Sequence, residues 1–329
     1  MAPSAAVGGC VLAIPSPSGE PVAYEVNCLE TVLVEDVLHR FLLERAGVRG
    51  VLVRLGSAWR EVAGRADYPP ALRDLLGQSL TASALLTGNI KLDGALSLEL
   101  KSAGALRLLF TECTDQGRLR GLARWHDPLP LPVPLALSAL PDAIMAITIG
   151  HAERGQRYQG LVELEQADLA GALENYFSQS EQLPARIVLA ADGEHAVGLM
   201  LQKLPDEGGR DAAGDEDGWT RIQHLTATLS AEELLKVAPE QLLYRLYHEE
   251  SVRLFEPRPL AFGCSCTRER VEAMLRSLGR VEVEAALAAH DEEVEVICEF
   301  CAQRYTFDRI DAEHLLSASA NTGSTTTTQ

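Results

Sequence analysis

The sequence has no run of about 18 uncharged apolar residues, the length that a helix needs to cross a bilayer. The segment Met1–Glu20 contains neither Lys nor Arg, whereas a secretory signal begins with basic residues and a transit peptide is rich in Arg. The sequence therefore predicts a soluble, cytoplasmic protein that is not bound to a membrane.

Basic residues are also scarce, because 29 Lys and Arg stand against 47 Asp and Glu, which gives a net charge of −18. Affinity for nucleic acid depends mostly on Lys and Arg that displace counterions from phosphates, so we expect no nucleic-acid partner. The signatures G-x-S-x-G, H-E-x-x-H, G-x-G-x-x-G and the Walker loop are absent. We accordingly predict a protein that is not an enzyme.

Seven cysteines are present, an odd number, and four of them lie between Cys264 and the C-terminal end of the sequence. Small secreted domains that depend on disulfides usually have an even number of cysteines. The distribution in this chain favours metal or redox chemistry in a reducing compartment. Cys10, Cys28 and Cys113 lie outside the cluster, and Cys113, at the end of an apolar strand, is predicted to pack as a small hydrophobic residue.

Apolar residues alternate or form short runs along several stretches, which is typical of strands. These stretches are Val51–Leu55, Leu96–Leu100, Leu106–Phe110, Ile144–Ile149, Ile187–Leu189 and Val197–Leu201. Two others, Leu72–Leu80 and Leu169–Phe177, have helical spacing. Gly121, Gly160 and Gly198 are interpreted as bulge or turn positions. The pattern predicts an α+β fold, with a large, mainly antiparallel sheet and packed helices in an N-terminal core.

Composition predicts five parts in the chain. They are an N-terminal extension with one short strand (1–35), an α+β core domain (36–205), a flexible and helical linker (206–260), a small zinc-binding domain (261–316) and a disordered tail (317–329). The linker begins with Gly, Asp and Glu and cannot bury enough apolar surface there to remain ordered alone. Further on it has helical signals, because Ser230 and Glu233 form a capping-box pattern and Pro239 suits the start of another helix.

The four clustered cysteines form two close pairs, Cys264-x-Cys266 and Cys298-x-x-Cys301, which are separated by the segment Thr267–Ile297. Four thiolates complete the tetrahedral coordination of Zn²⁺. Alternation before Cys298 and after Cys301 predicts a hairpin that carries the second pair, and Thr267 can cap a helix that ends at Gly279. Spacing alone leaves three interpretations open: structural zinc, a redox-active thiol centre, or buried cysteines without a ligand. The first two are compatible.

Two common cysteine sites fit this spacing less well. An ordinary zinc ribbon has a second C-x-x-C where this chain has C-x-C. A thioredoxin-type centre has its C-x-x-C at the start of a helix after a strand, whereas Cys298–Cys301 is predicted to be a turn between strands. A thiol oxidoreductase is therefore the second interpretation of these cysteines.

The cysteine pattern resembles the zinc centre of one family, the redox-regulated 33-kilodalton heat-shock chaperones. Other parts of the sequence resemble blocks of that family in the same order. These are Arg157–Gly160 (RYQG), Tyr176–Phe177, Glu181–Pro184 (EQLP), Leu242–Ser251 (LLYRLYHEES) and Cys264–Arg270 (CSCTRER). The resemblance extends from about His39 to Leu316, so it says nothing about the role of residues 1–35 or of the Ser/Thr-rich tail.

The resemblance implies a core, a helical linker docked on it and a C-terminal domain whose four thiolates hold Zn²⁺ until oxidation releases it. It implies disulfides between Cys264 and Cys266 and between Cys298 and Cys301. It also implies that the oxidised form dimerises and captures unfolding client proteins without ATP. A zinc domain of about 60 residues has a small core and depends on about 10–16 kcal/mol of metal binding, so oxidation should unfold it.

The linker contains an apolar stripe, made of Leu242, Leu243, Leu246 and Tyr247. The stripe either packs against the core or binds clients, and in a switch it can do both in turn, so we treat it as a candidate latch or client surface. His248 is predicted to lie on a helix surface beside acidic residues. His290 and His314 are not expected to be ligands, because four cysteines already complete a zinc site.

Three functions are considered on this basis. The first is a holdase chaperone controlled by a redox-sensitive zinc centre. The second is a thiol-disulfide oxidoreductase that uses the same cysteines. The third, a zinc-stabilised module that binds nucleic acid or a partner, is disfavoured by the net charge of −18.

Overall fold

The computed structural model describes residues 10–15, 21–26, 35–126, 135–151, 157–205, 217–289 and 292–318. The chain forms two compact units, unit 1 up to Phe262 and unit 2 from Gly263. In the N-terminal extension, β1 (Cys10–Pro15) and β2 (Pro21–Val26) pair as an antiparallel hairpin. We predicted one strand there, because Pro15, Pro17 and Pro21, which lie before and at the start of the second strand, concealed its alternation.

Unit 1 contains two six-stranded sheets. Sheet 1 has the order β10-β11-β4-β3-β12, with β13 also paired to β3, and every pair is antiparallel. Its strands are β3 (Val37–Leu43), β4 (Val48–Leu55), β10 (Ala185–Ala191), β11 (Ala196–Lys203), β12 (Val252–Leu254) and β13 (Arg258–Pro259). Linker strands thus complete a sheet whose other strands come from the core.

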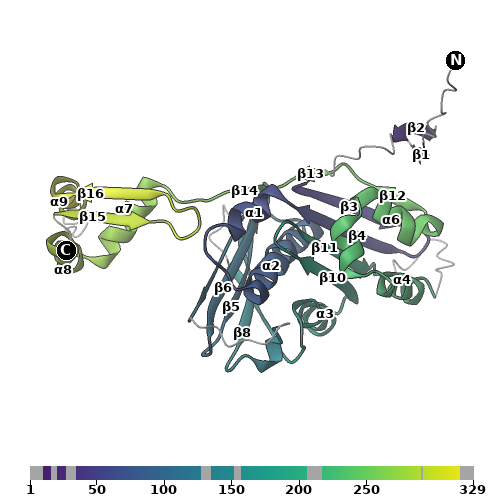
Figure 1. Cartoon of the computed structure of the whole chain (residues 1–329), viewed down its shortest axis with the longest axis horizontal. Coiled ribbons are helices and arrows are strands. Elements are labelled where there is room, and N and C mark those ends of the chain that lie inside the picture. The colour runs from purple at the N-terminus through teal and green to yellow at the C-terminus, as the bar shows by residue number, and fades with distance from the viewer. Residues whose placement is uncertain are drawn as a thin grey trace, which may run out of the picture. The chain divides into compact units, whose positions relative to one another are not determined.

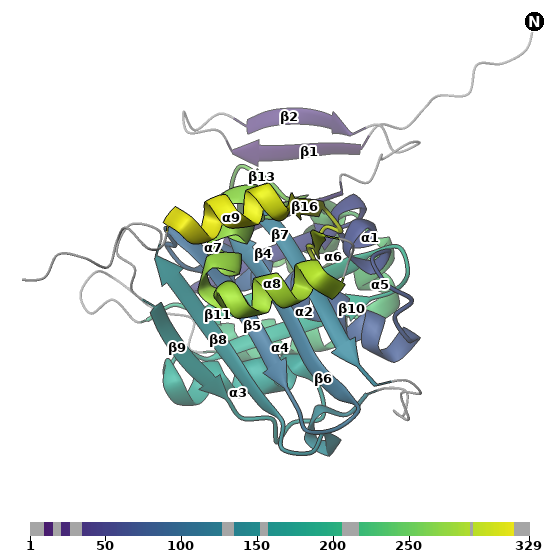
Figure 2. The same ribbon diagram turned by 90° about the vertical axis from the view of Figure 1, so that its left-hand side faces the viewer.

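Sheet 2 has the order β14-β7-β6-β5-β8-β9, and the strands from β7 to β9 run side by side in Figure 2. Its strands are β5 (Gly94–Lys101), β6 (Leu106–Thr114), β7 (Arg118–Trp125), β8 (Ile144–His151), β9 (Arg157–Val162) and β14 (Ala261–Phe262). All pairs are antiparallel except that of β14 with β7. The predicted α+β class is confirmed, with the strands divided between two sheets.

Helix α2 (Pro70–Asn89) lies between the two sheets (Figure 1) and contacts strands of both. Every residue from Ser79 to Gly88 is buried, because each face of the helix meets one sheet or the other. The buried hydroxyls have partners: Thr81 Oγ1 donates to the Gly77 carbonyl of the same helix at 2.9 Å, and Ser79 Oγ lies 2.9 Å from Thr111 Oγ1 on β6. This central helix explains why unit 1 has two sheets, because a helix that is buried on all sides needs a partner on each side.

Gly160 and Gly198 lie in regularly paired strands, so our interpretation of them as bulge or turn positions is wrong. A Cβ atom at Gly198 would lie 2.7 Å from Thr81 Cγ2, and one at Gly160 would lie 2.3 Å from the Tyr176 hydroxyl. The missing side chains therefore let helices approach the sheets closely. Gly121 is likewise regularly paired, and the register shift between β6 and β7 lies at Leu106/Leu108 instead.

The remaining helices of unit 1 cover the sheets. They are α1 (Ser57–Ala63), η1 (Leu137–Ala139), α3 (Leu169–Ser180), α4 (Gly218–Ala227), α5 (Ala231–Lys236), α6 (Pro239–Tyr247) and η2 (His248–Glu250). Ser230 caps α5 by accepting a hydrogen bond from the Glu233 N–H, and Pro239 begins α6, as predicted. The flexible boundary was predicted around Pro205–Gly218; Gly218 begins α4, and residues 206–216 lie outside the described residues.

Unit 2 is a hairpin surrounded by short helices. Its elements are α7 (Arg268–Leu278), α8 (Arg280–Ala289), β15 (Glu293–Ile297), β16 (Arg304–Asp308) and α9 (Arg309–Ala318). Thr267 caps α7, which ends at Gly279, and β15 pairs with β16, so the predicted capped helix and hairpin are both present. The first two residues of the predicted tail, 317 and 318, belong to α9, and residues 319–329 lie outside the described residues.

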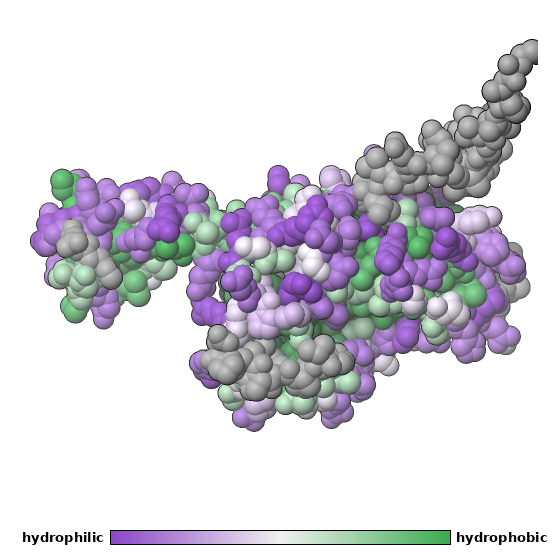
Figure 3. Space-filling view, in the orientation of Figure 1, coloured by the Kyte–Doolittle hydropathy of each residue, from purple (hydrophilic) through white to green (hydrophobic). Residues whose placement is uncertain are grey.

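Hydrophilic residues dominate the described surface on the face shown in Figure 3, in keeping with the strongly charged composition. Within the described ranges, no helix combines the length and the apolar character that a membrane span requires.

Candidate metal centre

The first cysteine pair lies directly before α7. The Thr267 side chain accepts a hydrogen bond from the Arg270 N–H and fixes the start of the helix. Arg270 in turn donates from Nη1 to the Ser265 carbonyl at 2.8 Å, between the two cysteines. The helix cap and this guanidinium together hold the loop that carries Cys264 and Cys266.

The second pair lies in the turn of the β15–β16 hairpin. The Cys298 N–H donates to the Gln303 carbonyl at 2.9 Å, and the Cys298 carbonyl accepts from the Ala302 N–H at 2.7 Å. Ala302 has a φ of +57°, a left-handed conformation that a non-glycine residue adopts only where its surroundings require it. The turn thereby closes tightly enough for Cys301 to face back toward Cys298.

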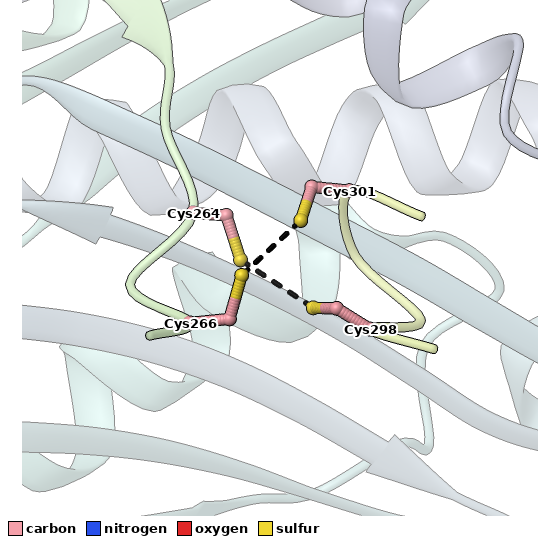
Figure 4. A group of neighbouring side chains, drawn as sticks. All are labelled: Cys264, Cys266, Cys298 and Cys301. Atoms are coloured by element: carbon pink, nitrogen blue, oxygen red, sulfur yellow. Dashed lines mark hydrogen bonds between the residues drawn. The ribbon is translucent and has the colours of Figure 1, made fainter. Parts of the chain in front are cut away.

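All four Sγ atoms lie within 4.8 Å of one another, and Figure 4 shows the four side chains converging. Two close contacts cross between the pairs, with 3.6 Å from Cys264 Sγ to Cys298 Sγ and 3.3 Å from Cys266 Sγ to Cys301 Sγ. The cysteines are free thiols in this form. Folding has therefore brought together two pairs that the whole segment Thr267–Ile297 separates in the sequence.

This geometry fits a tetrahedral metal ion. With Zn–S bonds of about 2.3 Å, neighbouring sulfurs of a tetrahedral site lie about 3.8 Å apart, close to the separations found here. Burial, together with hydrogen bonds in which the Cys301 thiol interacts with the three neighbouring sulfurs in its protonated form, raises the pKa of Cys301 to about 12. The Cys301 thiol thus resists ionisation unless a cation compensates the charge of the thiolate. Since soft thiolates favour Zn²⁺, the donor set suits the predicted ion.

Tyr305, on β16, also contacts the cysteines. Its hydroxyl donates a hydrogen bond to Cys266 Sγ at 3.3 Å. This hydrogen bond and partial burial raise the pKa of Tyr305 to about 12, so the hydroxyl keeps its proton at neutral pH.

Within the described ranges, no other cysteine or histidine belongs to this group of potential ligands. Cys113 is fully buried on β6, and burial raises its pKa to about 12, which confirms that it packs as an apolar residue. His314 is exposed on α9, and His248 is a surface residue 3.9 Å from Glu249 Oε1. Cys28, His290 and the side chain of Cys10 lie outside the described residues.

Comparisons with known proteins identify the chain's relatives. The model of a family described as Hsp33 protein matches residues 36–308. The chain belongs to the Hsp33 family. The 33 kDa chaperonins of Azotobacter vinelandii and Nitrosococcus oceani are each 45% identical to it over 86% of this chain, and the matches cover 95% and 94% of those proteins.

A crystal structure of the 33 kDa chaperonin (heat shock protein 33 homolog) from Thermotoga maritima covers 88% of this chain and all of that one, with a TM-score of 0.74. At 21% identity this likeness shows a shared fold. The resemblance drawn from the cysteine spacing and the sequence blocks is therefore confirmed, and the chain is a member of a chaperone family.

In this Hsp33-family chain the linker stripe is buried. Leu242, Leu243, Leu246 and Tyr247 are between 0% and 8% exposed and pack against the face of sheet 1 opposite α2. The Tyr247 hydroxyl lies 2.8 Å from Thr226 Oγ1, and its ring stacks on Phe41 at 6.3 Å between centroids. The stripe is thus packed against the core in the reduced form.

The segment Arg258–Phe262, here called the strap, joins both sheets of unit 1. Its first two residues pair with β3 of sheet 1, and its last two pair with β7 of sheet 2. Between them, the buried Leu260 donates its N–H to the Asp36 carbonyl at 2.7 Å. Only Gly263 separates the strap from Cys264.

Several polar residues of the Hsp33 chain escaped prediction from sequence. Arg221 donates from Nε and Nη2 to the carboxylate of the buried Glu250, at 2.6 and 2.9 Å. Arg54 is 1% exposed and donates to the Leu235 carbonyl at 2.7 Å. Nothing in a single sequence distinguishes these residues from surface charges, and Tyr305 showed only the alternation of a strand.

Proposed function

We propose that this Hsp33-family chain is an ATP-independent holdase whose activity is switched on by oxidation of Cys264, Cys266, Cys298 and Cys301. In the reduced form these four residues hold one Zn²⁺. The observation that carries the proposal is the convergence of all four Sγ atoms within 4.8 Å. The four cysteines lie in a unit whose apolar cluster, within the described residues, has only eight buried members.

The proposed switch assigns a role to each part of the chain. Residues 36–205 form the core domain, residues 206–260 form the linker, and residues 261–316 form the zinc-binding domain. The zinc ion, when bound, keeps the thiolates deprotonated and holds the small domain in its fold. The domain is joined to the strap and the linker through the chain, so its folding limits the freedom of the residues next to Gly263.

The chemistry requires an oxidant of the peroxide class. One thiolate of a pair attacks a peroxide oxygen, the O–O bond breaks, and a sulfenic acid and hydroxide form. The second thiolate attacks that sulfur, so an S–S bond forms and a second hydroxide leaves. Each pair loses two electrons and the peroxide gains two. The pairs proposed are Cys264 with Cys266 and Cys298 with Cys301.

Loss of the thiolate ligands should unfold the zinc-binding domain and release the linker. The stripe of Leu242, Leu243, Leu246 and Tyr247 would then leave sheet 1, and burial of each such side chain contributes about 1.5–3 kcal/mol. The exposed apolar surface would bind unfolding client proteins and, in the oxidised form, a second copy of the chain. We place this activity in the cytoplasm, without nucleic acid as a partner.

A light-scattering assay of a thermally unfolding protein tests the proposal, with reduced zinc-loaded and oxidised zinc-free samples. We expect stoichiometric suppression of aggregation by the oxidised sample alone. The variant Cys113→Ser should behave as wild type, because Cys113 is buried away from the centre. Equal suppression by both samples contradicts the switch, and repeated turnover of a dithiol substrate would favour a thiol-disulfide oxidoreductase instead.

The role of the stripe as a latch needs its own variant. Changing Leu242 and Leu246 together to Asp should undock the linker, so the reduced protein should bind a hydrophobic dye and suppress aggregation. Tyr244 lies on the same helix but is 58% exposed, so Tyr244→Asp is the matched control and should leave the reduced protein inactive. A double variant that stays inactive when reduced, yet switches normally, would show that the stripe is not the latch.

A further inference from the structure

Tyr305 is a polar neighbour of the four cysteines that offers no ligand atom of its own to a complete zinc site. Its hydroxyl lies 3.3 Å from Cys266 Sγ and is the donor in that contact. Cys266 Sγ is also 3.3 Å from Cys301 Sγ. The hydroxyl therefore contacts the centre at a sulfur where the two cysteine pairs meet.

The tyrosine ring is held in place by the fold of unit 2. Tyr305 pairs with Val296 across the hairpin, and both side chains pack against the apolar cluster. Phe307, two residues further along β16 and on the same face, is 1% exposed within that cluster. Because the ring is fixed on the core side, the hydroxyl reaches Cys266 as a preorganised donor.

A hydrogen bond to a ligand sulfur has a definite effect on a thiolate centre. Four thiolates on a divalent ion carry a net charge of about −2, and a donor withdraws part of that charge from the sulfur it contacts. The sulfur then becomes a weaker nucleophile toward an oxidant, while the ligand set is held in the arrangement that retains the metal. Both effects act in the same direction, because each slows the loss of zinc.

We propose that Tyr305 is a positioning residue that stabilises the Cys266 thiolate and sets how readily the centre loses zinc to a chelator or an oxidant. The proposal rests on the zinc centre described under the proposed function. It adds that the ease with which an oxidant releases the zinc depends on one hydroxyl group, held in place by the core of unit 2, as well as on the cysteines.

The test is Tyr305→Phe, which removes the hydroxyl and keeps the ring. Zinc affinity is measured by competition with a chromogenic chelator, and the rate of zinc release is measured with peroxide. We expect about tenfold weaker zinc binding, the lower end of the effect of removing a partner of a metal ligand, and faster release by peroxide. In the Co²⁺-loaded protein, the thiolate-to-cobalt charge-transfer bands should shift in the variant.

Two further variants separate the hydroxyl from packing. Val296→Ala loosens the same hairpin without touching the hydroxyl, so it should lower the melting temperature of unit 2 and leave the cobalt bands unchanged. Tyr244→Phe, on an exposed tyrosine of unit 1, should change neither.

The outcomes distinguish this proposal from the one on which it rests. If wild type binds and releases zinc on oxidation and Tyr305→Phe matches it in affinity, rate and cobalt bands, the role of Tyr305 is overturned alone. If wild type binds no zinc at all, the proposed function falls and the role of Tyr305 falls with it. Shifted bands and weaker affinity in Tyr305→Phe, with Val296→Ala spectrally unchanged, support the role.

Discussion

Unit 1 and unit 2 are folded by different means. In unit 1, α2 is enclosed between two sheets and a second apolar cluster lies under the linker helices. The described apolar cluster of unit 2 has eight buried residues, and the same unit holds four thiols whose Sγ atoms lie within 4.8 Å of one another. On the proposed function, burial alone sustains the first unit, whereas the second needs a cation. A chain built in this way can lose one part of its structure and keep the other.

Removal of the metal should produce the largest difference in stability between the two units. Chelation under reducing conditions removes about 10–16 kcal/mol of binding free energy from unit 2 and none from unit 1. Hydrogen exchange should then show loss of protection from Arg268 to Leu315 while β4 and α2 stay protected. Cys298→Ser should reproduce this loss of protection without a chelator. Protection of α7 in the absence of metal would contradict the proposed dependence of unit 2 on metal.

Matched truncations of one phenylalanine in each apolar cluster should affect zinc affinity differently in the two units. Phe41 in sheet 1 and Phe307 in β16 are each 1% exposed, and truncation of such a side chain to Ala costs about 3–5 kcal/mol. In unit 2 this cost should appear as weaker zinc binding, because metal binding and folding are linked. Phe41→Ala should lower the stability of unit 1 and leave zinc affinity unchanged. Equal zinc affinities in the two variants would contradict the linkage.

A smaller loss of stability is expected when the ion pair between Arg221 and Glu250 in the linker is broken. Arg221→Met leaves the carboxylate of Glu250, which is 2% exposed, without its bidentate partner. Breaking such a pair costs about 3–5 kcal/mol when both groups are buried, and we expect about 2 kcal/mol here because the Arg221 side chain is 36% exposed. Hydrogen exchange of α4 and α6 measures the loss. Arg221→Met combined with Glu250→Gln should recover part of it, and no change in either variant would count against the pair.

The smallest expected effect is a pH dependence in unit 1. Burial lowers the pKa of His39 below its ordinary value of 6.5, and the Glu240 carboxylate only partly opposes this. Below about pH 6.5 the unfolded state therefore binds the proton more readily than the folded state. The free energy of unfolding should fall as pH decreases through this range, by at most about 1.4 kcal/mol per pH unit, and be unaffected by His39 above it.

Urea unfolding at pH 7.5 and 5.5 measures this dependence. His39→Gln should reduce the difference between the two pH values, whereas His248→Gln should not, because His248 is exposed. An unchanged difference in His39→Gln would show that other groups carry the acid sensitivity.

Local features were predictable from the sequence where the responsible residues are neighbours. Thr267 and Gly279 mark the two ends of α7, and the alternation around the second cysteine pair defines the hairpin. The clustering of two cysteine pairs followed from the chemistry of thiolates, which needs few other residues.

Features that depend on distant residues were not predictable. Alternation identifies a strand but not its neighbours, so the division into two sheets emerges only with α2 in place between them. Gly198 is needed because Thr81 and Leu85 approach it from a helix far away in the sequence. The contact between Tyr305 and Cys266 joins residues 39 positions apart, and nothing in a single sequence marks it.

The strap determines how far the thiols can travel. While Phe262 is paired with β7, Cys264 is two residues from a fixed point and stays within about 7 Å of it. If the strap leaves both sheets, the nearest paired residue before it is Leu254 in β12, ten residues from Cys264. The reach grows to about 35 Å and the volume that Cys264 can sample grows about a hundredfold. Release of the five residues of the strap thus allows Cys264 to meet partners that lie far beyond its reach while the strap is paired.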